Sequence, residues 1–346
     1  MSPAADADLP GLPLRELGPH LAERVPEIGE APLRASLISG GRSNLTYLLT
    51  DGTTRWVLRR PPLGEVLATA HDMGREYWMI KALYPSAVPV PRPVHLAGPD
   101  DEAVLGAPFF IMGFAEGEVL RDHDQLLGVA RPDRLARHLM SCLADLHAVD
   151  PEDVGLGDLG RPDGYLDRQL DRWLRQVGSI SSPLERRFAE VATSLRHRLP
   201  RTQRTSLVHG DYRLDNVVVG PGERIVAVLD WEMATRGDPL ADVASTLVWW
   251  DGMRGLDSPV AAHPGDLPGY PGREALAAAY AEAGDLDLDD LDWYLGFAFY
   301  KIAAIFEGIR HRHDAGLTVG AGFERLGPLV PHLLDSATTS ATGGHL

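Results

Sequence analysis

The chain has 346 residues, of which 44% are apolar and 24% are charged, and this composition indicates a globular protein with one large or two ordinary domains. It carries 33 Lys and Arg against 49 Asp and Glu, a net charge of -16, and no long basic run, which argues against nucleic acid as the main partner. A single cysteine, Cys142, excludes an internal disulfide framework and suits a reducing compartment, so we expect a cytoplasmic protein.

The two ends of the chain have the composition of loose tails. Residues 1–12 are rich in Ala, Asp and Pro and contain no apolar core long enough for a signal peptide. Residues 336–346 read SATTSATGGHL, and we expect them to be disordered. Between the ends, no stretch approaches the roughly 18 to 20 apolar residues that a membrane span needs, so we expect no membrane partner.

The first part of the chain predicts a strand pair. Residues 35–60 contain alternating and β-branched residues on either side of an Asp-Gly pair at 51–52, which predicts two antiparallel strands joined by a tight turn. The second strand ends in two arginines, Arg59 and Arg60. Because side chains alternate along a strand, these two arginines should point to opposite faces of the sheet.

Helical periodicity and apolar runs predict the remaining elements. The chain predicts helices over 14–25, 71–83, 134–149, 165–177, 184–199, 273–283 and 291–313, and a buried strand over 109–114. The second of these helices can turn Trp78 inward, and the third buries Cys142 as an inert thiol. Four polar residues interrupt the apolar spacing of the last helix and could face an acceptor cleft, although a surface position is our expectation: Tyr300, Lys301, Glu307 and Arg310.

The most informative stretch, 207–244, reads LVHGDYRLDNVVVGPGERIVAVLDWEMATRGDPLADVA. Two short β-branched runs between residues 217 and 229 flank a Gly-Pro-Gly turn, and together they predict a β-hairpin. Asp211 and Asn216 precede the first strand of this hairpin, and Asp230 follows the second. We therefore expect the three polar side chains to converge at one end of the strand pair.

Asp, Asn and Asp in this arrangement suit magnesium-dependent phosphoryl transfer. Magnesium prefers oxygen ligands and usually lies between one or two protein ligands and the phosphates of a nucleotide, so Asn216 and Asp230 could bind it. Asp211 could orient the acceptor hydroxyl and take its proton, because this reaction depends on positioning and charge neutralisation more than on covalent help. Protein kinases place a catalytic Asp five residues before a metal-binding Asn, which is the spacing of Asp211 and Asn216.

At these residues the chain resembles a known family. The string HGDYRLDN, followed by LDWEMATRGDPLADVA, is similar to the aminoglycoside phosphotransferase family, the small-molecule branch of the protein kinase-like fold. Within the family it most resembles the branch related to kinase domains fused to acyl-CoA dehydrogenases. The resemblance implies an α+β fold with a small N-terminal antiparallel β lobe that carries a helix, over 1–115, and a larger, mainly helical C-terminal lobe over 116–346.

The resemblance also implies nucleotide-binding residues in the first lobe. A loop of small residues is expected to cover the phosphates of ATP, through Gly40, Gly41, Ser43 and Asn44. The family has a phosphate-holding lysine near the end of the second strand, where this chain offers arginine, and the strand register favours Arg59. Glu76 is the carboxylate partner implied for Arg59, with a solvated Glu76 as the alternative, and Met112 and Phe114 are expected to flank the adenine.

Further roles are implied within the catalytic stretch itself. Arg213 stands where serine/threonine kinases have a lysine that touches the transferring phosphate. We expect His209 to pack beneath the metal site. Asp238 and Asp242 are expected to cap the next helix and to brace the catalytic loop through backbone amides.

The sequence thus predicts a phosphotransferase that uses ATP and Mg²⁺ to phosphorylate a hydroxyl group of a small molecule, as a monomer or a homodimer. The resemblance of the motif residues to the branch fused to acyl-CoA dehydrogenases favours a hydroxylated acyl-CoA or a hydroxy acid as the acceptor. One alternative is an aminoglycoside or a choline-like amino alcohol, which an acidic cleft built from Glu307 and residues 285–292 would favour. Another is a catalytically weak nucleotide-binding scaffold, a pseudokinase, which arginine in the lysine position motivates.

Overall fold

The computed structural model describes residues 9–29, 31–39, 44–63, 72–256, 263–316 and 322–341. The chain divides into two compact units, one made of Met1–Glu116 with Leu229–Glu232 and the other of Gly117–Val228 with Met233–Leu346. The predicted boundary between residues 115 and 116 places Leu229–Glu232 in the second lobe. This assignment is wrong, because the segment packs with the first unit.

The first unit is built on a five-stranded antiparallel sheet with the strand order β1-β2-β3-β5-β4. Its strands are β1 (Arg34–Ser39), β2 (Leu45–Thr50), β3 (Arg55–Arg60), β4 (Pro93–Leu96) and β5 (Phe110–Gly113). The turn between β2 and β3 forms because Asp51 Oδ1 accepts hydrogen bonds from the backbone N–H groups of Thr53 and Thr54, at 2.8 and 2.6 Å. The predicted strand pair is therefore β2 and β3, and β1 adds a third strand ahead of it.

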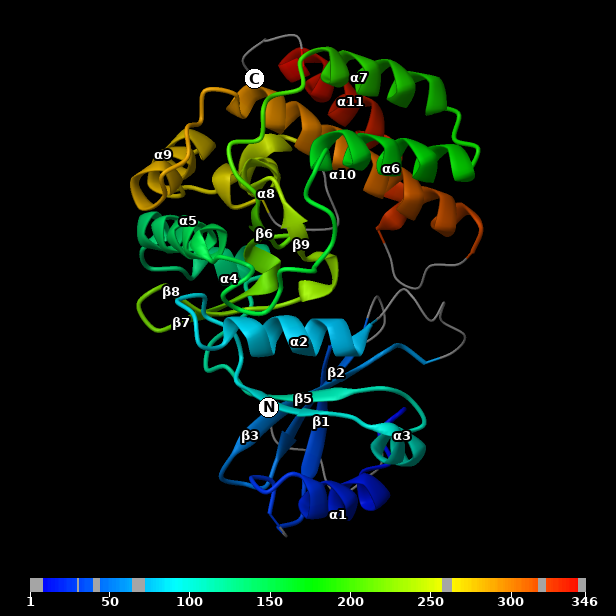
Figure 1. Ribbon diagram of the computed structural model, residues 1–346, viewed down its shortest axis with the longest axis vertical. Coiled ribbons are helices and arrows are strands. Elements are labelled where there is room, and N and C mark those ends of the chain that lie inside the picture. Colours follow the sequence, from blue (N-terminus) through cyan, green and yellow to red (C-terminus); the bar gives the residue numbers. More distant parts are fainter. Residues whose placement is uncertain are drawn as a thin grey trace. The chain divides into compact units, whose positions relative to one another are not determined.

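Among the described residues, three helices flank this sheet. In Figure 1, α2 (Met73–Leu83) lies on one side of the sheet, and α1 (Leu14–Arg24) and α3 (Pro99–Leu105) lie on the other. The apolar core of the unit fills the space between the sheet, α1 and α3. The Asp72 side chain caps α2 by accepting a hydrogen bond from the backbone N–H of Arg75, at 2.9 Å.

Two sequence-based expectations for this unit are wrong. Trp78 of α2 is 52% exposed, because Tyr77, Met79 and Ile80 supply the buried face of the helix. Residues 9–12 do not form a loose tail, because Leu12 is fully buried and belongs to the core beneath α1. Residues 1–8 lie outside the described residues.

The second unit is mainly helical. Its helices are α4 (His123–Leu127), α5 (Pro132–Ala148), α6 (Tyr165–Ser179), α7 (Glu185–His197), α8 (Pro239–Leu247), α9 (Arg273–Ala283), α10 (Leu291–Asp314) and α11 (Leu329–Ala341). Helix α10 packs against α6, α7, α8 and α11, as Figure 1 shows, so it forms the centre of the helical unit. A helix that is covered on several sides must be apolar nearly all round, and α10 is buried over most of its length.

Two short strand pairs carry the catalytic stretch. Strand β6 (Ser206–Val208) pairs with β9 (Thr235–Gly237), and β7 (Val217–Gly220) pairs with β8 (Arg224–Val228), both antiparallel. The hairpin predicted between residues 217 and 229 is thus β7 and β8. The loop between β6 and β7, which contains a 3₁₀ turn over Leu214–Asn216, is held at both ends by these strands.

The C-terminal expectation is wrong in part. Residues 336–341 are not disordered, because α11 continues to Ala341 with Ala337 and Ser340 buried. The small residues allow α11 to approach α10 closely at Gly296, where a Cβ atom would lie 3.1 Å from the carbonyl oxygen of Ala337. Residues 342–346 are outside the described part of the chain.

The architecture is the α+β organisation predicted from the sequence, with a small antiparallel sheet unit and a larger helical unit. Across the described ranges, none of the helices combines the length and apolar character that crossing a membrane requires.

Candidate active site

The loop between β6 and β7 brings Asp211 and Asn216 into direct contact. Asn216 Nδ2 donates hydrogen bonds to Asp211 Oδ2 at 3.0 Å and to the Asp211 carbonyl oxygen at 2.9 Å. The 3₁₀ turn over Leu214–Asn216 closes the distance, because it folds the chain back within the five-residue spacing. Since the amide nitrogen of Asn216 faces Asp211, its amide oxygen is the atom that could coordinate magnesium.

Arg213 lies beside this pair and holds several contacts at once. Its Nε lies 3.3 Å from Asp211 Oδ2, and its Nη1 lies 3.2 Å from Asp215 Oδ2. Its guanidinium also stacks over the Trp249 ring, with Cζ 4.6 Å from the ring centroid. Burial raises the pKa of Asp215, and Arg213 opposes this rise. The guanidinium is therefore fixed next to the predicted catalytic carboxylate, and its contact with phosphate stays a prediction.

Asp242 of α8 braces the loop from beneath. Its carboxylate accepts hydrogen bonds from the backbone N–H groups of His209 and Gly210, at 2.5 and 2.9 Å. Burial opposes ionisation of Asp242, but His147, His209 and Lys301 outweigh burial and lower its pKa. His209 is fully buried and its Nδ1 accepts a hydrogen bond from the Asp211 N–H at 3.2 Å. The bracing of the loop expected of Asp242 is present, and His209 is buried beneath the loop, whereas its place beneath a metal site stays a prediction.

Asp238 has the capping position expected for it. Its Oδ1 accepts a hydrogen bond from the backbone N–H of Leu240 at 3.1 Å, and its Oδ2 accepts one from the Tyr294 hydroxyl at 2.8 Å. Helix α8 therefore starts at a side chain that α10 also holds. This fixes the end of α8 from which Asp242 reaches the loop.

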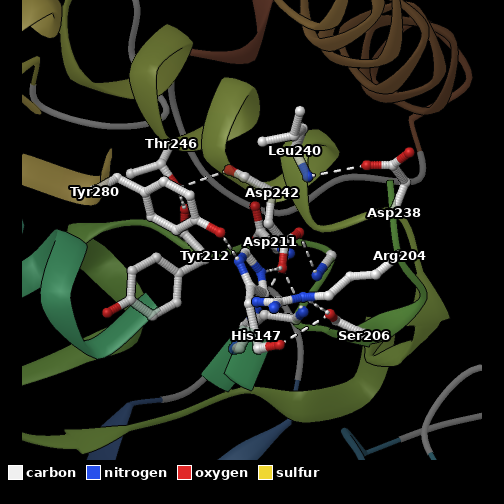
Figure 2. Close-up of polar contacts among 12 residues, drawn as sticks. His147, Arg204, Ser206, Asp211, Tyr212, Asp238, Leu240, Asp242, Thr246 and Tyr280 are labelled. Atoms are coloured by element: carbon white, nitrogen blue, oxygen red, sulfur yellow. Dashed lines mark hydrogen bonds and ion pairs between the residues drawn. The ribbon is translucent and has the colours of Figure 1, made fainter. Parts of the chain in front are cut away.

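Figure 2 shows a buried polar network around Asp242 that the sequence did not reveal. His147 of α5 shares a hydrogen bond of 2.7 Å with the Tyr280 hydroxyl of α9, and its Nε2 lies 3.6 Å from Asp242 Oδ2. The Thr246 hydroxyl donates to the carbonyl oxygen of Tyr212 at 2.9 Å. The network ties α5, α8 and α9 to the loop, and only the final fold could have joined residues so distant in sequence.

Lys301 is the largest departure from the sequence-based expectation in this unit. The surface position expected for Tyr300, Lys301 and Glu307 is wrong, because their exposed fractions are 0%, 8% and 0%. Lys301 Nζ donates a hydrogen bond to the carbonyl oxygen of Gly210, the residue before Asp211. The apolar residues on every face of α10 were the signal that could have indicated burial.

In the first unit, Arg59 joins two carboxylates. Its Nε lies 3.1 Å from Glu76 Oε2, and its Nη2 lies 2.9 Å from Asp230 Oδ1. Arg60 points to the other face of the sheet, where its Nη1 donates to the carbonyl oxygen of Gly11 at 2.5 Å. The predicted register and the expected Arg59–Glu76 pairing are both present, and the alternative of a solvated Glu76 is wrong, because that side chain is 1% exposed.

The charges of this group reflect its burial. Burial opposes the charge of Arg59, but attraction to Glu76 and Asp230 outweighs it and raises the pKa of the guanidinium. Burial also raises the pKa of Glu76 to about 7, against the attraction of Arg59. Asp230 has a left-handed backbone conformation with φ of 65°, which Asp tolerates better than most residues with a Cβ atom. The carboxylate of Asp230 is thus held by Arg59 at a distinctive turn after β8.

The other residues expected to bind the nucleotide are placed as follows. Asn44 is 4% exposed and directly precedes β2, whereas Gly40, Gly41 and Ser43 lie outside the described residues. Met112 is buried in β5 opposite Val57 of β3. The Phe114 ring lies beneath the guanidinium of Arg55, 4.3 Å from its Cζ.

Glu307 does not contribute to the acidic acceptor cleft that was considered for it and residues 285–292. Glu307 is fully buried, accepts a hydrogen bond from the Ser182 hydroxyl and pairs with Arg310, 2.7 Å from Nη2. Asp285 pairs with Arg204 at 2.7 Å. Glu307 is therefore a structural group rather than a surface that an acceptor could touch.

Two groups of predicted site residues thus exist, each within one unit. Asp211, Arg213 and Asn216 lie together in the second unit, and Arg59, Glu76 and Asp230 in the first. The convergence of Asp230 with Asp211 and Asn216 stays a prediction. Within the described residues, no group of three or more His, Cys, Asp or Glu side chains is arranged to bind a metal ion. An Asn and an Asp suit Mg²⁺ bound mainly by phosphate oxygens and water.

Comparison with known proteins agrees with this chemistry. A sequence model of the phosphotransferase enzyme family matches residues 34–293. Acyl-CoA dehydrogenase family member 11 of Rattus norvegicus is 32% identical to the chain over 315 residues. That match covers 88% of this chain and 40% of the relative, so the chain spans less than half of the relative's length.

Solved structures share the fold. A protein of Ralstonia eutropha JMP134 assigned as an aminoglycoside phosphotransferase is 29% identical, with a TM-score of 0.79 and coverage of 96% of this chain and 99% of that chain. The streptomycin–ATP–APH(2'')-IIa ternary complex is 17% identical, with a TM-score of 0.56 and coverage of 88% and 92%. At that identity, the second likeness concerns the fold alone.

Proposed function

Because this chain belongs to the phosphotransferase enzyme family, we propose that it transfers the γ-phosphate of ATP to a hydroxyl group of a small molecule, with Mg²⁺ as the metal. The observation that carries this proposal is the contact between Asp211 and Asn216, 3.0 Å from Nδ2 to Oδ2, in a loop braced by Asp242. This contact unites the two residue types that the reaction requires at the spacing found in kinases.

Asp211 orients the acceptor hydroxyl in this proposal and takes its proton as the phosphate transfers. The carboxylate suits the task because Asn216 and Arg213 fix one of its oxygens, leaving its direction set before the substrate binds. Arg213 adds positive charge where the transferring group develops negative charge. Asn216 and Asp230 would hold Mg²⁺, which would supply positive charge to neutralise the phosphates.

Arg59 has two tasks in this proposal. It contacts the phosphates of ATP, and it holds Asp230 through the ion pair of 2.9 Å. Glu76 orients Arg59 from the other side, at 3.1 Å. In the same proposal, Met112 and Phe114 flank the adenine. The phosphates are covered by a loop of small residues, to which Gly40, Gly41, Ser43 and Asn44 belong.

We propose a hydroxylated acyl-CoA or hydroxy acid as the acceptor. The rat relative is named for an acyl-CoA dehydrogenase, which supports an acyl acceptor in this branch of the family. Burial of Glu307 speaks against the acidic cleft that would attract a cation. The solved relatives assigned to aminoglycosides support an aminoglycoside or amino alcohol as the second candidate. The pseudokinase alternative rests on Arg59, whose partners are already two carboxylates.

The test is ADP release with magnesium-ATP across two acceptor sets, hydroxyacyl-CoAs with their free acids, and aminoglycosides with choline-like amino alcohols. We expect turnover on the first set and its loss in Asp211→Asn, which keeps the size of the side chain and removes the carboxylate. Turnover on the second set alone would show that the acceptor is an aminoglycoside or an amino alcohol, not an acyl compound. Binding of ATP without Asp211-dependent turnover on either set would contradict the kinase proposal and favour the pseudokinase.

A further inference from the structure

We propose that Lys301 is a positioning residue for Asp211, which it serves by fixing the peptide group that precedes this carboxylate. The inference rests on the proposed function, because it matters only where Asp211 acts on an acceptor. Lys301 comes from α10, 90 residues further along the chain than Asp211 and outside every motif of the catalytic stretch.

The two peptide groups that meet at the Cα atom of Gly210 are each held by a side chain. Lys301 Nζ donates to the carbonyl oxygen of Gly210, and the N–H of Gly210 donates to Asp242 Oδ1 at 2.9 Å. The donor comes from α10 and the acceptor from α8, so two packed helices set the direction of the chain as it enters Asp211. Rotation of the peptide plane between Gly210 and Asp211 would swing the Asp211 side chain, and Lys301 holds the carbonyl oxygen of this plane while its N–H donates to His209 Nδ1 at 3.2 Å. Asp242 holds the peptide group before it, so the contacts together define how the chain enters Asp211 and where its carboxylate points.

The backbone at Gly210 explains why the contact must come from a distant side chain. Gly210 has φ of 83°, and a Cβ atom at this position would lie 2.8 Å from the carbonyl oxygen of Met233. No side chain larger than hydrogen fits there, so residue 210 has no side chain of its own that could hold the loop in place. The flexibility of glycine would leave the loop free to rotate unless its two polar backbone groups are bonded.

The charge of Lys301 is unusual for its surroundings. Lys301 is 8% exposed, and burial lowers its pKa against the attraction of Asp211 and Asp242, while Arg172 and Arg213 lower it further. An apolar residue would be the ordinary choice at a buried position of α10. A buried cation beside the carbonyl that precedes a catalytic carboxylate is explained by the hydrogen bond that it makes there.

The identity of the cation supports the same role. Lys81 and Lys301 are the only lysines in a chain with 33 Lys and Arg residues, so arginine is this protein's ordinary cation. An ammonium group is a compact point charge that can bond one carbonyl in a narrow space, whereas a guanidinium is a wide fork suited to paired oxygens. The use of lysine at 301 fits a contact with one oxygen.

The experiment compares three variants of the full chain on the best acceptor. Lys301→Met keeps the length of the side chain and removes both charge and donor, and we expect kcat to fall about 10- to 100-fold with the KM for ATP nearly unchanged. Lys301→Gln keeps a donor for the Gly210 carbonyl, and we expect it to recover part of the loss. Tyr300→Phe, a buried neighbour on α10 whose hydroxyl is outside the loop contacts, is the matched control and should turn over like wild type.

Amide hydrogen exchange gives a readout that does not depend on turnover. In Lys301→Met, we expect the amides of Gly210 and Asp211 to exchange at least about tenfold faster, while the amides of α10 remain as in wild type. Unchanged exchange at these two amides, or unchanged kcat despite faster exchange, would overturn the proposal. An equal loss of kcat in Tyr300→Phe would also overturn it, because the loss would then belong to the helix. If wild type has no Asp211-dependent turnover, the proposed function fails, whereas exchange still decides whether Lys301 holds the loop.

Discussion

Arg59 and Lys301 are both buried cations, yet they stabilise different parts of their units. Arg59 reaches two carboxylates, Glu76 and Asp230, with separate nitrogens of one guanidinium. Lys301 reaches one backbone carbonyl, that of Gly210. A planar fork suits paired acceptors, and a compact ammonium suits a single one. In this pair, the arginine fixes two side chains of the sheet unit and the lysine fixes the backbone of a loop in the helical unit.

The largest effect is expected when Arg59 is removed. Arg59→Met leaves two carboxylates without their shared cation, and we expect the free energy of unfolding to fall by about 3 kcal/mol. Under the proposed function the KM for ATP should rise about tenfold or more. Arg59→Lys keeps the charge but cannot form both ion pairs with one nitrogen, so its effects should be intermediate. Denaturant unfolding and steady-state kinetics measure both, and a Met variant that matches wild type in both would contradict the role given to Arg59.

The pH dependence of stability tests the burial of Glu76, the partner of Arg59. Burial raises the pKa of Glu76 from 4.5 to about 7, so the folded protein binds this proton more tightly than the unfolded chain does. The stability that the proton confers is complete below pH 4.5 and is lost as the pH rises through about 7, to a limit of about 3 kcal/mol.

Glu76→Gln provides the matched measurement, because glutamine imitates the protonated carboxyl. Between about pH 5 and about pH 8, wild type should lose more free energy of unfolding than the variant does. All other titrating groups are shared and cancel in the difference. A difference that stays constant across this range would show that Glu76 does not take up the proton.

The next prediction concerns Gly210, whose carbonyl oxygen Lys301 holds. A methyl group added at this residue tests how tightly the loop is packed. Gly210→Ala introduces a Cβ atom 2.8 Å from the Met233 carbonyl oxygen at a backbone φ of 83°, and we expect a loss of about 2 kcal/mol in unfolding free energy. Gly222→Ala is the control, because its φ is 69° but the nearest atoms to its Cβ lie 3.8 Å away. Thermal unfolding should show the smaller loss for Gly222→Ala, and equal losses would mean that the contact at Met233 relaxes freely.

The smallest effect concerns a buried group that stays neutral. Burial raises the pKa of the Cys142 thiol to about 12, so its thiolate fraction is about a thousandfold below that of a thiol with the ordinary value of 9. We expect no reaction with a disulfide reagent in native buffer, full reaction in denaturant, and no change in turnover after native treatment. Rapid labelling of the native protein would show that α5 opens at this position.

The fold was largely predictable, because periodicity and turn residues are local signals. The hairpin β7–β8 and helix α10 were placed within a few residues, and the resemblance to the phosphotransferase family and its α+β fold is confirmed. The helical extension of residues 336–341 was missed because Ala and Ser stabilise it only by fitting against α10 at Gly296. The exposure of Trp78 was missed because its helix offers enough other apolar residues to fill the core.

The candidate site was predictable only where the spacing of residues along the sequence, or a family motif, brings its side chains together. The contact of Asp211 with Asn216 follows from a loop spacing, and the choice of Arg59 over Arg60 follows from a strand register, whereas the pairing of Arg59 with Glu76 was implied by the family resemblance. The parts that join distant helices, such as His147 with Tyr280 and Lys301 with Gly210, have no local signal. Glu307 was misplaced for the same reason, because its partner Ser182 lies 125 residues away.

The central claim is that Asp211 directs a phosphate from ATP to a hydroxyl oxygen. The most direct test is ³¹P NMR of the product formed from magnesium-ATP and the best acceptor, with wild type and Asp211→Asn side by side. We predict a new phosphate monoester resonance coupled to the protons of the acceptor's carbinol carbon, formed together with ADP by wild type and absent with the variant. A product that contains only ADP and inorganic phosphate, or a monoester formed equally by Asp211→Asn, would contradict the account.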